Sequence, residues 1–218
     1  MFEAVIFDMD GLMFDTEPIW ASCWPVTLDE FGLACKPGLA DAMRGSNGEE
    51  AVSIIREWYG EQVDARAIVS HFYTIAPEAL RNGAPQKPGL DVLVGYLKTI
   101  GVPMAVASSS SREMIKANLE RAGMLEDFSA IVSGLEMEHA KPFPDVFLRA
   151  AELLGASPER SLVLEDSYNG VRAGAAGGFC TVMVPDLSKP TDEMRRLATC
   201  ILPSLTAVKE SIEAGTLR

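Results

Sequence analysis

Short apolar segments alternate with amphipathic segments along most of this chain, and this alternation constrains the fold more than any other feature. We expect five buried strands, at residues 3–7, 102–107, 130–133, 160–165 and 179–184. Segments with helical spacing lie between them, over residues 112–122, 144–154 and 168–176. Strands that alternate with helices form right-handed βαβ units. The sequence therefore predicts an α/β protein with a doubly wound parallel sheet.

Residues 15–83 do not follow this pattern. Their apolar residues recur at roughly helical intervals, glycines mark the turns, and no segment resembles a buried strand. We therefore expect an all-helical domain inserted after the first strand. The predicted architecture is a Rossmann-like core domain of residues 1–14 and 84–218, with a helical cap domain of residues 15–83.

The charge balance of the chain argues against a nucleic-acid partner. The formal net charge is −12 and the isoelectric point is about 4.6, whereas proteins that bind the nucleic-acid backbone need an excess of Lys and Arg. We therefore expect no nucleic-acid partner. Any anionic substrate must be held by local positive charge.

The sequence also argues against secretion and membrane insertion. Its N-terminal apolar segment is broken by Glu3, Asp8 and Asp10 and lacks the basic start of a signal peptide. No apolar run reaches the roughly 18 residues of a membrane span. The four cysteines form no CxxC pair, which is typical of thiols in a reducing compartment. We expect a cytoplasmic protein without a membrane partner.

Carboxylates follow two of the predicted strands. Asp8 and Asp10 come at the end of the first strand, and Glu165 and Asp166 come at the end of the fourth. Ligands of parallel α/β sheets bind beside the carboxyl ends of the strands. Clustered carboxylates repel one another unless a cation neutralises them, and hard oxygen ligands suit Mg²⁺. The sequence predicts a magnesium site at this edge.

Groups suited to phosphate converge on the same edge. Ser108 and Ser109 come after the second strand and lead into a helix, an arrangement that binds anions. Lys141, after the third strand, adds a positive charge. An ionised Asp8 beside metal and phosphate could attack phosphorus, and Asp10 could protonate the leaving oxygen and then activate water. The sequence thus favours phosphoryl transfer.

The same residues carry a family resemblance. The chain resembles the haloacid dehalogenase-like superfamily, in the branch of β-phosphoglucomutase-like phosphatases with a helical cap. Four motifs carry the resemblance, in the family's order: Phe7-Asp8-Met9-Asp10-Gly11, Ala107-Ser108-Ser109-Ser110, Lys141-Pro142-Phe143-Pro144-Asp145 and Leu164-Glu165-Asp166.

The resemblance implies a role for each motif. Asp8 would be the nucleophile, Asp10 the general acid and base, and Ser108 and Lys141 the phosphate-binding residues. The same resemblance implies that Mg²⁺ would be held by Asp8, the backbone carbonyl of Asp10 and Asp166, with assistance from Glu165.

The cap sequence bears on which reaction the enzyme catalyses. The mutases of this branch have a sequence pattern with His at the position that Trp20 occupies here and Arg at the position that Gly48 occupies here. Arg44 offers one phosphate-facing charge in this chain. A mutase must hold a second phosphate, so these differences favour hydrolysis. We expect a monomeric phosphatase of small phosphorylated metabolites, such as sugar phosphates, with a cap that closes over the site. The alternatives are a phosphosugar mutase and an inactive scaffold that binds a phosphorylated ligand or a partner protein.

Overall fold

The computed structural model describes residues 2–44, 46, 48–80 and 83–217. The chain divides into two compact units. The core unit comprises Met1–Asp15 and Pro85–Arg218, and the helical unit comprises Thr16–Ala84. Of the residues 15–83 that the sequence assigns to the cap domain, Gly45, Asn47, Arg81 and Asn82 lie outside the described residues.

The core unit contains a parallel sheet of six strands in the order β3-β2-β1-β4-β5-β6. The strands are β1 (Ala4–Phe7), β2 (Met104–Ser108), β3 (Ala130–Ser133), β4 (Ser161–Glu165), β5 (Cys180–Met183) and β6 (Cys200–Ile201). The predicted α/β class and parallel sheet are confirmed. The sequence pattern did not predict β6, an edge strand of two half-buried residues.

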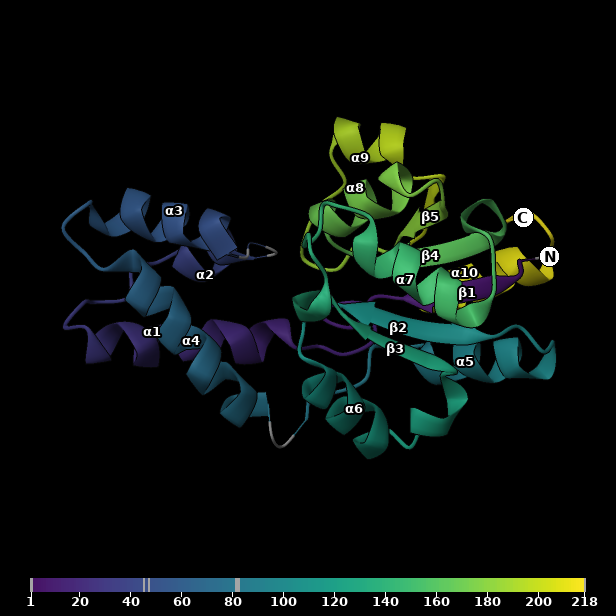
Figure 1. Cartoon of the computed structure of the whole chain (residues 1–218), viewed down its shortest axis with the longest axis horizontal. Coiled ribbons are helices and arrows are strands. Elements are labelled where there is room, and N and C mark those ends of the chain that lie inside the picture. Colours follow the sequence, from purple (N-terminus) through teal and green to yellow (C-terminus); the bar gives the residue numbers. More distant parts are fainter. Residues whose placement is uncertain (1, 45, 47, 81–82, 218) are drawn as a thin grey trace. The chain divides into compact units, whose positions relative to one another are not determined.

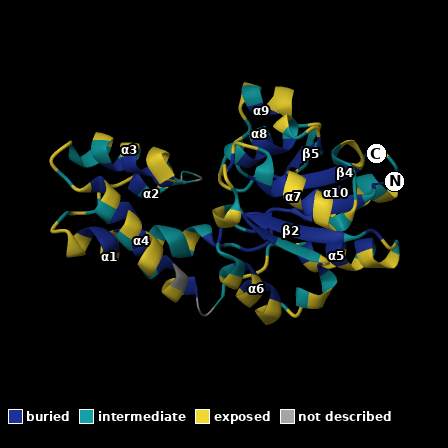
Figure 2. Ribbon diagram, viewed as in Figure 1, coloured by how far each residue is buried: buried dark blue, intermediate teal, exposed yellow. Residues whose placement is uncertain are grey.

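Helices cover both faces of this sheet (Figure 1). They are α5 (Leu90–Thr99), α6 (Arg112–Arg121), α7 (Asp145–Leu154), α8 (Tyr168–Ala176), α9 (Asp192–Leu197) and α10 (Leu205–Glu213). Short 3-10 turns lie at η2 (Leu125–Asp127), η3 (Gly134–Glu136) and η4 (Pro158–Arg160). Helix α7 packs its apolar residues against Ile6, Ala105 and Val163 on one face. The central strands are buried on both faces, as Figure 2 shows, which explains their uninterrupted apolar sequences.

Side-chain caps fix where several helices begin. Ser111, Ser167 and Ser204 each accept a hydrogen bond from the backbone N–H three residues further on, and so start α6, α8 and α10. Two of these caps lie just after β2 and β4. The loops at the carboxyl ends of these strands are consequently short and fixed at both ends.

The helical unit contains α1 (Glu17–Glu30), α2 (Leu39–Met43), α3 (Gly48–Tyr59) and α4 (Ala65–Ala79), which confirms the predicted helical insert. Its core includes Trp24, Ile55, Ile68 and Phe72. The rings of Trp24 and Phe72 stack with their centroids 3.9 Å apart, and Trp20 stacks on Phe72 at 5.7 Å. Both tryptophans therefore take part in packing this unit.

Among the described helices, none combines the length and the apolar composition that crossing a lipid bilayer requires.

Candidate active site

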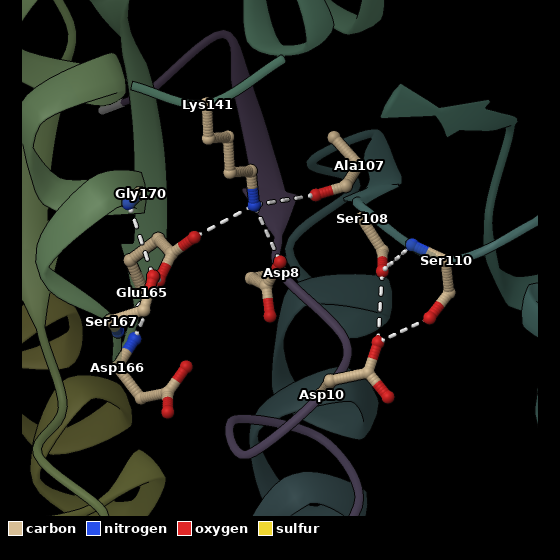
Figure 3. Close-up of polar contacts among 10 residues, drawn as sticks. All are labelled: Asp8, Asp10, Ala107, Ser108, Ser110, Lys141, Glu165, Asp166, Ser167 and Gly170. Carbon is tan, nitrogen blue, oxygen red and sulfur yellow. Dashed lines mark hydrogen bonds and ion pairs between the residues drawn. The ribbon is translucent and has the colours of Figure 1, made fainter. Parts of the chain in front are cut away.

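The candidate site lies at the carboxyl ends of the three central strands. Strand β1 pairs with β2 on one side and with β4 on the other, so that Phe7 lies level with Val106 and Leu164. Asp8 is the next residue, and its N–H donates to the carbonyl of Leu164. The short loops after these strands bring the acidic, hydroxyl and lysine side chains of the predicted motifs to one place (Figure 3).

Lys141 is the centre of the ionic contacts in this site. Its side chain is buried, and its Nζ donates to Asp8 Oδ1 at 2.5 Å, to Glu165 Oε1 at 2.7 Å and to the Ala107 carbonyl at 3.3 Å. An ammonium has three N–H donors, so each has an acceptor. Nζ also lies 4.6 Å from the centre of the Phe147 ring, a cation–π distance. Lys141 thus joins the motif after β3 to the ends of β1, β2 and β4.

Burial and charge shift the pKa values of this pair. Burial raises the pKa of the Asp8 carboxyl well above its ordinary value; Lys141 opposes the shift, while Glu165 and Asp10 add to it. Burial alone would lower the pKa of Lys141, but attraction by Asp8 and Glu165 outweighs burial and raises it. Lys141 therefore stays charged at neutral pH. The Lys141 ammonium also favours the ionised form of Asp8, against the effect of burial on the pKa of that carboxyl.

Glu165 is completely buried, and both of its oxygens accept hydrogen bonds. Oε1 binds Lys141, while Oε2 accepts from the N–H of Asp166 and from the N–H and hydroxyl of Ser167 at 2.8 to 2.9 Å. A Cβ built on Gly170 would overlap with the whole carboxylate. Only glycine at position 170 leaves room for the Glu165 carboxylate in this pose.

One group of carboxylates is suited to a divalent cation. Oxygens of Asp8, Glu165 and Asp166 lie within 4.8 Å of one another, and all three residues are buried. Gly11, with φ of +85°, lets the loop after Asp8 pass close to Asp166, because a Cβ there would lie 2.9 Å from the Asp166 Cγ. Lys141 can balance one of three negative charges, so a divalent cation would balance the rest. The donor set thus fits Mg²⁺.

Asp10 points to the loop after β2. Its Oδ2 accepts from the hydroxyl of Ser108 at 3.0 Å and from the hydroxyl of Ser110 at 2.7 Å. Its Oδ1 is buried and has no hydrogen-bond partner among the described residues. Ser110 was not among the residues expected in the site, although it belongs to the polar segment after the second predicted strand.

Two predicted phosphate-binding residues lie outside this network of contacts. Ser109 is exposed between Ser108 and Ser110. Arg44 belongs to the helical unit, where it forms ion pairs with Glu17 at 3.3 Å and with Asp41 at 2.6 Å. The positive charge of Arg44 is thus matched by carboxylates of its own unit.

Comparison with known proteins agrees with this geometry. The haloacid dehalogenase-like hydrolase family matches residues 2–178, which include every motif of the site. The chain belongs to this family. Several curated relatives that match most of the chain are named as phosphatases, and the predicted enzyme class, a phosphoric monoester hydrolase, is confirmed.

Three curated relatives illustrate the range of sequence identity and coverage. Hexitol phosphatase B of Escherichia coli K12 is 29% identical, over 93% of this chain and 92% of its own length. Fructose-1-phosphate phosphatase YqaB of the same strain is 30% identical, over 84% of this chain and 96% of its own length. The bifunctional riboflavin kinase/FMN phosphatase of Arabidopsis thaliana is 35% identical over 86% of this chain, and the chain spans only 49% of that protein's length.

Solved structures of other proteins show the same fold. CbbY from Rhodobacter sphaeroides, in complex with phosphate, has a TM-score of 0.79 at 24% identity and covers 95% of this chain and 96% of its own. β-Phosphoglucomutase from Clostridium difficile has a TM-score of 0.76 at 21% identity over the full length of both chains. The predicted likeness to the β-phosphoglucomutase branch therefore holds for the fold.

Proposed function

We propose that this enzyme is a Mg²⁺-dependent phosphatase that hydrolyses phosphate monoesters of small metabolites, and that Asp8 carries the phosphoryl group as an aspartyl-phosphate. The observation that carries the proposal is the position of Asp8: it is buried, forms an ion pair with Lys141, and belongs to the carboxylate cluster with Glu165 and Asp166. A carboxylate that contacts a fixed cation and can also ligate a metal is suited to nucleophilic attack on a phosphate ester.

The reaction would proceed in two steps. In the first, an Asp8 carboxylate oxygen forms a bond to phosphorus while the bond from phosphorus to the ester oxygen breaks. Asp10 gives its proton to that leaving oxygen. In the second step a water molecule attacks phosphorus, the bond to Asp8 breaks, and Asp10 takes the proton of the water. Asp10 thus returns to its starting state, and the products are an alcohol and inorganic phosphate.

The phosphate would be held by groups of the core unit. Lys141 can bind a phosphate oxygen by exchanging its longest contact, the carbonyl of Ala107, while it keeps Asp8 and Glu165. The hydroxyl of Ser108 and the loop at Ser109 would supply further donors, as the sequence predicts.

The bound cation would lie on Asp8 and Asp166, with the backbone carbonyl of Asp10 as a further predicted ligand. Glu165 would assist mainly by its negative charge, since its oxygens already accept four hydrogen bonds. Mg²⁺ at this site would screen the charge of the phosphate from that of Asp8 and favour the ionised carboxylate.

We propose a phosphorylated sugar or sugar alcohol as the substrate. Support comes from the two Escherichia coli relatives, a hexitol phosphatase and a fructose-1-phosphate phosphatase. Hydrolysis is favoured over the mutase reaction because a mutase must hold a second phosphate. The expected charge for that task, Arg44, is already paired with Glu17 and Asp41, and Gly48 and Trp20 replace the Arg and His of the mutase pattern. The cytoplasmic location and the monomeric state stay predictions; the four cysteines, all free, suit a reducing compartment.

The proposal is tested with a panel of phosphorylated metabolites in the presence of Mg²⁺, measuring both free phosphate and isomerised product. We expect phosphate release that disappears in Asp8→Asn, whose side chain has nearly the same shape. Unchanged turnover in that variant would refute the proposal. Isomerisation that needs a bisphosphate activator and releases no net phosphate would instead show a mutase.

A further inference from the structure

The hydrogen bonds of Asp10 point to a role for Ser110, the second residue after β2. Two hydroxyls, those of Ser108 and Ser110, donate to the same oxygen, Asp10 Oδ2. The other oxygen, Oδ1, is buried without a partner among the described residues. This arrangement separates the two oxygens: Oδ2 anchors the side chain, and Oδ1 is left to exchange a proton.

The two serines are not equivalent in the proposed reaction. A hydroxyl carries one hydrogen and can donate it to one acceptor at a time. If Ser108 turns its hydroxyl to a bound phosphate, as the sequence predicts, it must release Asp10. Ser110 is then the hydroxyl that still holds the Asp10 carboxylate. Its bond to Oδ2 is also the shorter of the two, 2.7 Å against 3.0 Å.

Ser110 is itself held firmly. Its N–H donates to the Ser108 hydroxyl oxygen at 3.0 Å, and its carbonyl accepts from the hydroxyl of Ser133 at 2.7 Å. Ser133 is buried at the end of β3 and accepts from the N–H of Leu135. Ser110 is also largely buried. The neighbouring strand end thus fixes the backbone of Ser110, and its hydroxyl has a defined direction.

We propose that Ser110 is a positioning residue for Asp10: it anchors Oδ2 so that Oδ1 faces the oxygen that leaves phosphorus. This inference rests on the proposed phosphatase function. In the first step the proton moves from Asp10 Oδ1 to the ester oxygen as the bond from that oxygen to phosphorus breaks. In the second step the attacking water gives a proton to the same Oδ1. The hydrogen bond of Ser110 stays in place in both steps.

A pair of substrates that differ in their need for a proton tests this role. p-Nitrophenyl phosphate releases a stable phenolate and needs little help from a general acid, whereas benzyl phosphate, of similar size, releases an alkoxide unless it is protonated. The quantity to measure is the ratio of kcat/KM for benzyl phosphate to kcat/KM for p-nitrophenyl phosphate. We expect Ser110→Ala to lower this ratio roughly tenfold, a part of the 10²- to 10⁴-fold that general acid catalysis contributes. Ser110→Thr, which keeps the hydroxyl, should restore it.

Two controls separate positioning from folding. Ser111→Ala removes the cap of α6 in the same loop, and we expect it to lower the melting temperature but leave the ratio unchanged. In an Asp10→Asn background, Ser110→Ala should have no further effect on the ratio, because the residue through which it acts is already changed.

Several results would overturn the inference. Equal losses on both esters in Ser110→Ala would indicate a structural role, and so would a fall in the ratio that persists in the Asp10→Asn background. An unchanged ratio in Ser110→Ala would show that Ser108 alone suffices. A wild-type enzyme that releases phosphate from neither of these esters nor from any member of the metabolite panel would refute the proposed function itself, and this role of Ser110 with it.

Discussion

Replacement of Gly170 by alanine tests whether the position of Glu165 controls the site. A Cβ at position 170 would overlap with the Glu165 carboxylate. Nonbonded heavy atoms need about 3.5 Å, so the carboxylate must move by more than about 1 Å. Such a shift disrupts its bonds to Lys141 and to the N–H groups of Asp166 and Ser167. Since misplacement by about 1 Å can lower a rate about 100-fold, we expect kcat/KM to fall at least that far.

Gly174 provides a matched control. It lies one turn further along the same helix, and a Cβ there would lie 2.5 Å from Thr181 Oγ1 and 3.0 Å from Thr181 Cγ2, away from the ionic contacts of the site. Overpacking costs about 1–3 kcal/mol of unfolding free energy, so both variants should be less stable. Only Gly170→Ala should lose activity per folded molecule.

The assay combines urea denaturation, which measures the unfolding free energy, with steady-state hydrolysis of p-nitrophenyl phosphate at a temperature where both variants are folded. Full activity in Gly170→Ala would refute the view that Glu165 must hold Lys141 in place. Equal losses of activity in both variants would attribute the effect to packing of α8 rather than to the site.

Three other variants or additions test particular contacts. Lys141→Met leaves Asp8 and Glu165 without their shared cation. We therefore expect denaturation to show a loss of about 3–5 kcal/mol in unfolding free energy, and we expect no measurable phosphatase activity. Near-normal stability of this variant would contradict the ionic contacts of Lys141. Mg²⁺ at 100 times its dissociation constant should stabilise the protein by about 2.7 kcal/mol, and a calorimetric scan should show this as a rise of roughly 5–10 °C in Tm. The variant Asp166→Asn should lose most of that rise. Phe72→Ala removes the ring that stacks on Trp24 in the helical unit, and it should lower the unfolding free energy by about 3–5 kcal/mol. A loss below about 1 kcal/mol would contradict a packed core in this unit.

Much of the fold could be predicted because the central strands are buried on both faces and therefore leave uninterrupted apolar segments in the sequence. Strand β6 could not be predicted, since its two half-buried residues are too few to form such an apolar segment. Helix α5 is a different case. Its buried residues Leu90, Leu93, Val94 and Leu97 have helical spacing, but no element was predicted there.

The candidate site was predictable at the level of strand ends. Parallel strands bring the loops at their carboxyl ends to one edge of the sheet, so the proximity of Asp8, Lys141 and Glu165 is a consequence of the topology. The topology does not determine which partner each carboxylate binds, because that depends on the directions of side chains from segments far apart in the sequence. The bond of Ser110 to Asp10 and the space that Gly170 leaves for Glu165 are of this second kind.

Direct detection of a phosphorylated Asp8 tests the central claim most sharply. Turnover of p-nitrophenyl phosphate with Mg²⁺ would be stopped by acid, and the protein treated with borohydride, which reduces an aspartyl-phosphate to homoserine. Peptide mass spectrometry then locates the change. We expect homoserine at position 8 in the wild-type protein and none in Asp8→Asn, which should also release no phosphate. Homoserine at another aspartate, or turnover that persists in Asp8→Asn, would contradict the proposed role of Asp8.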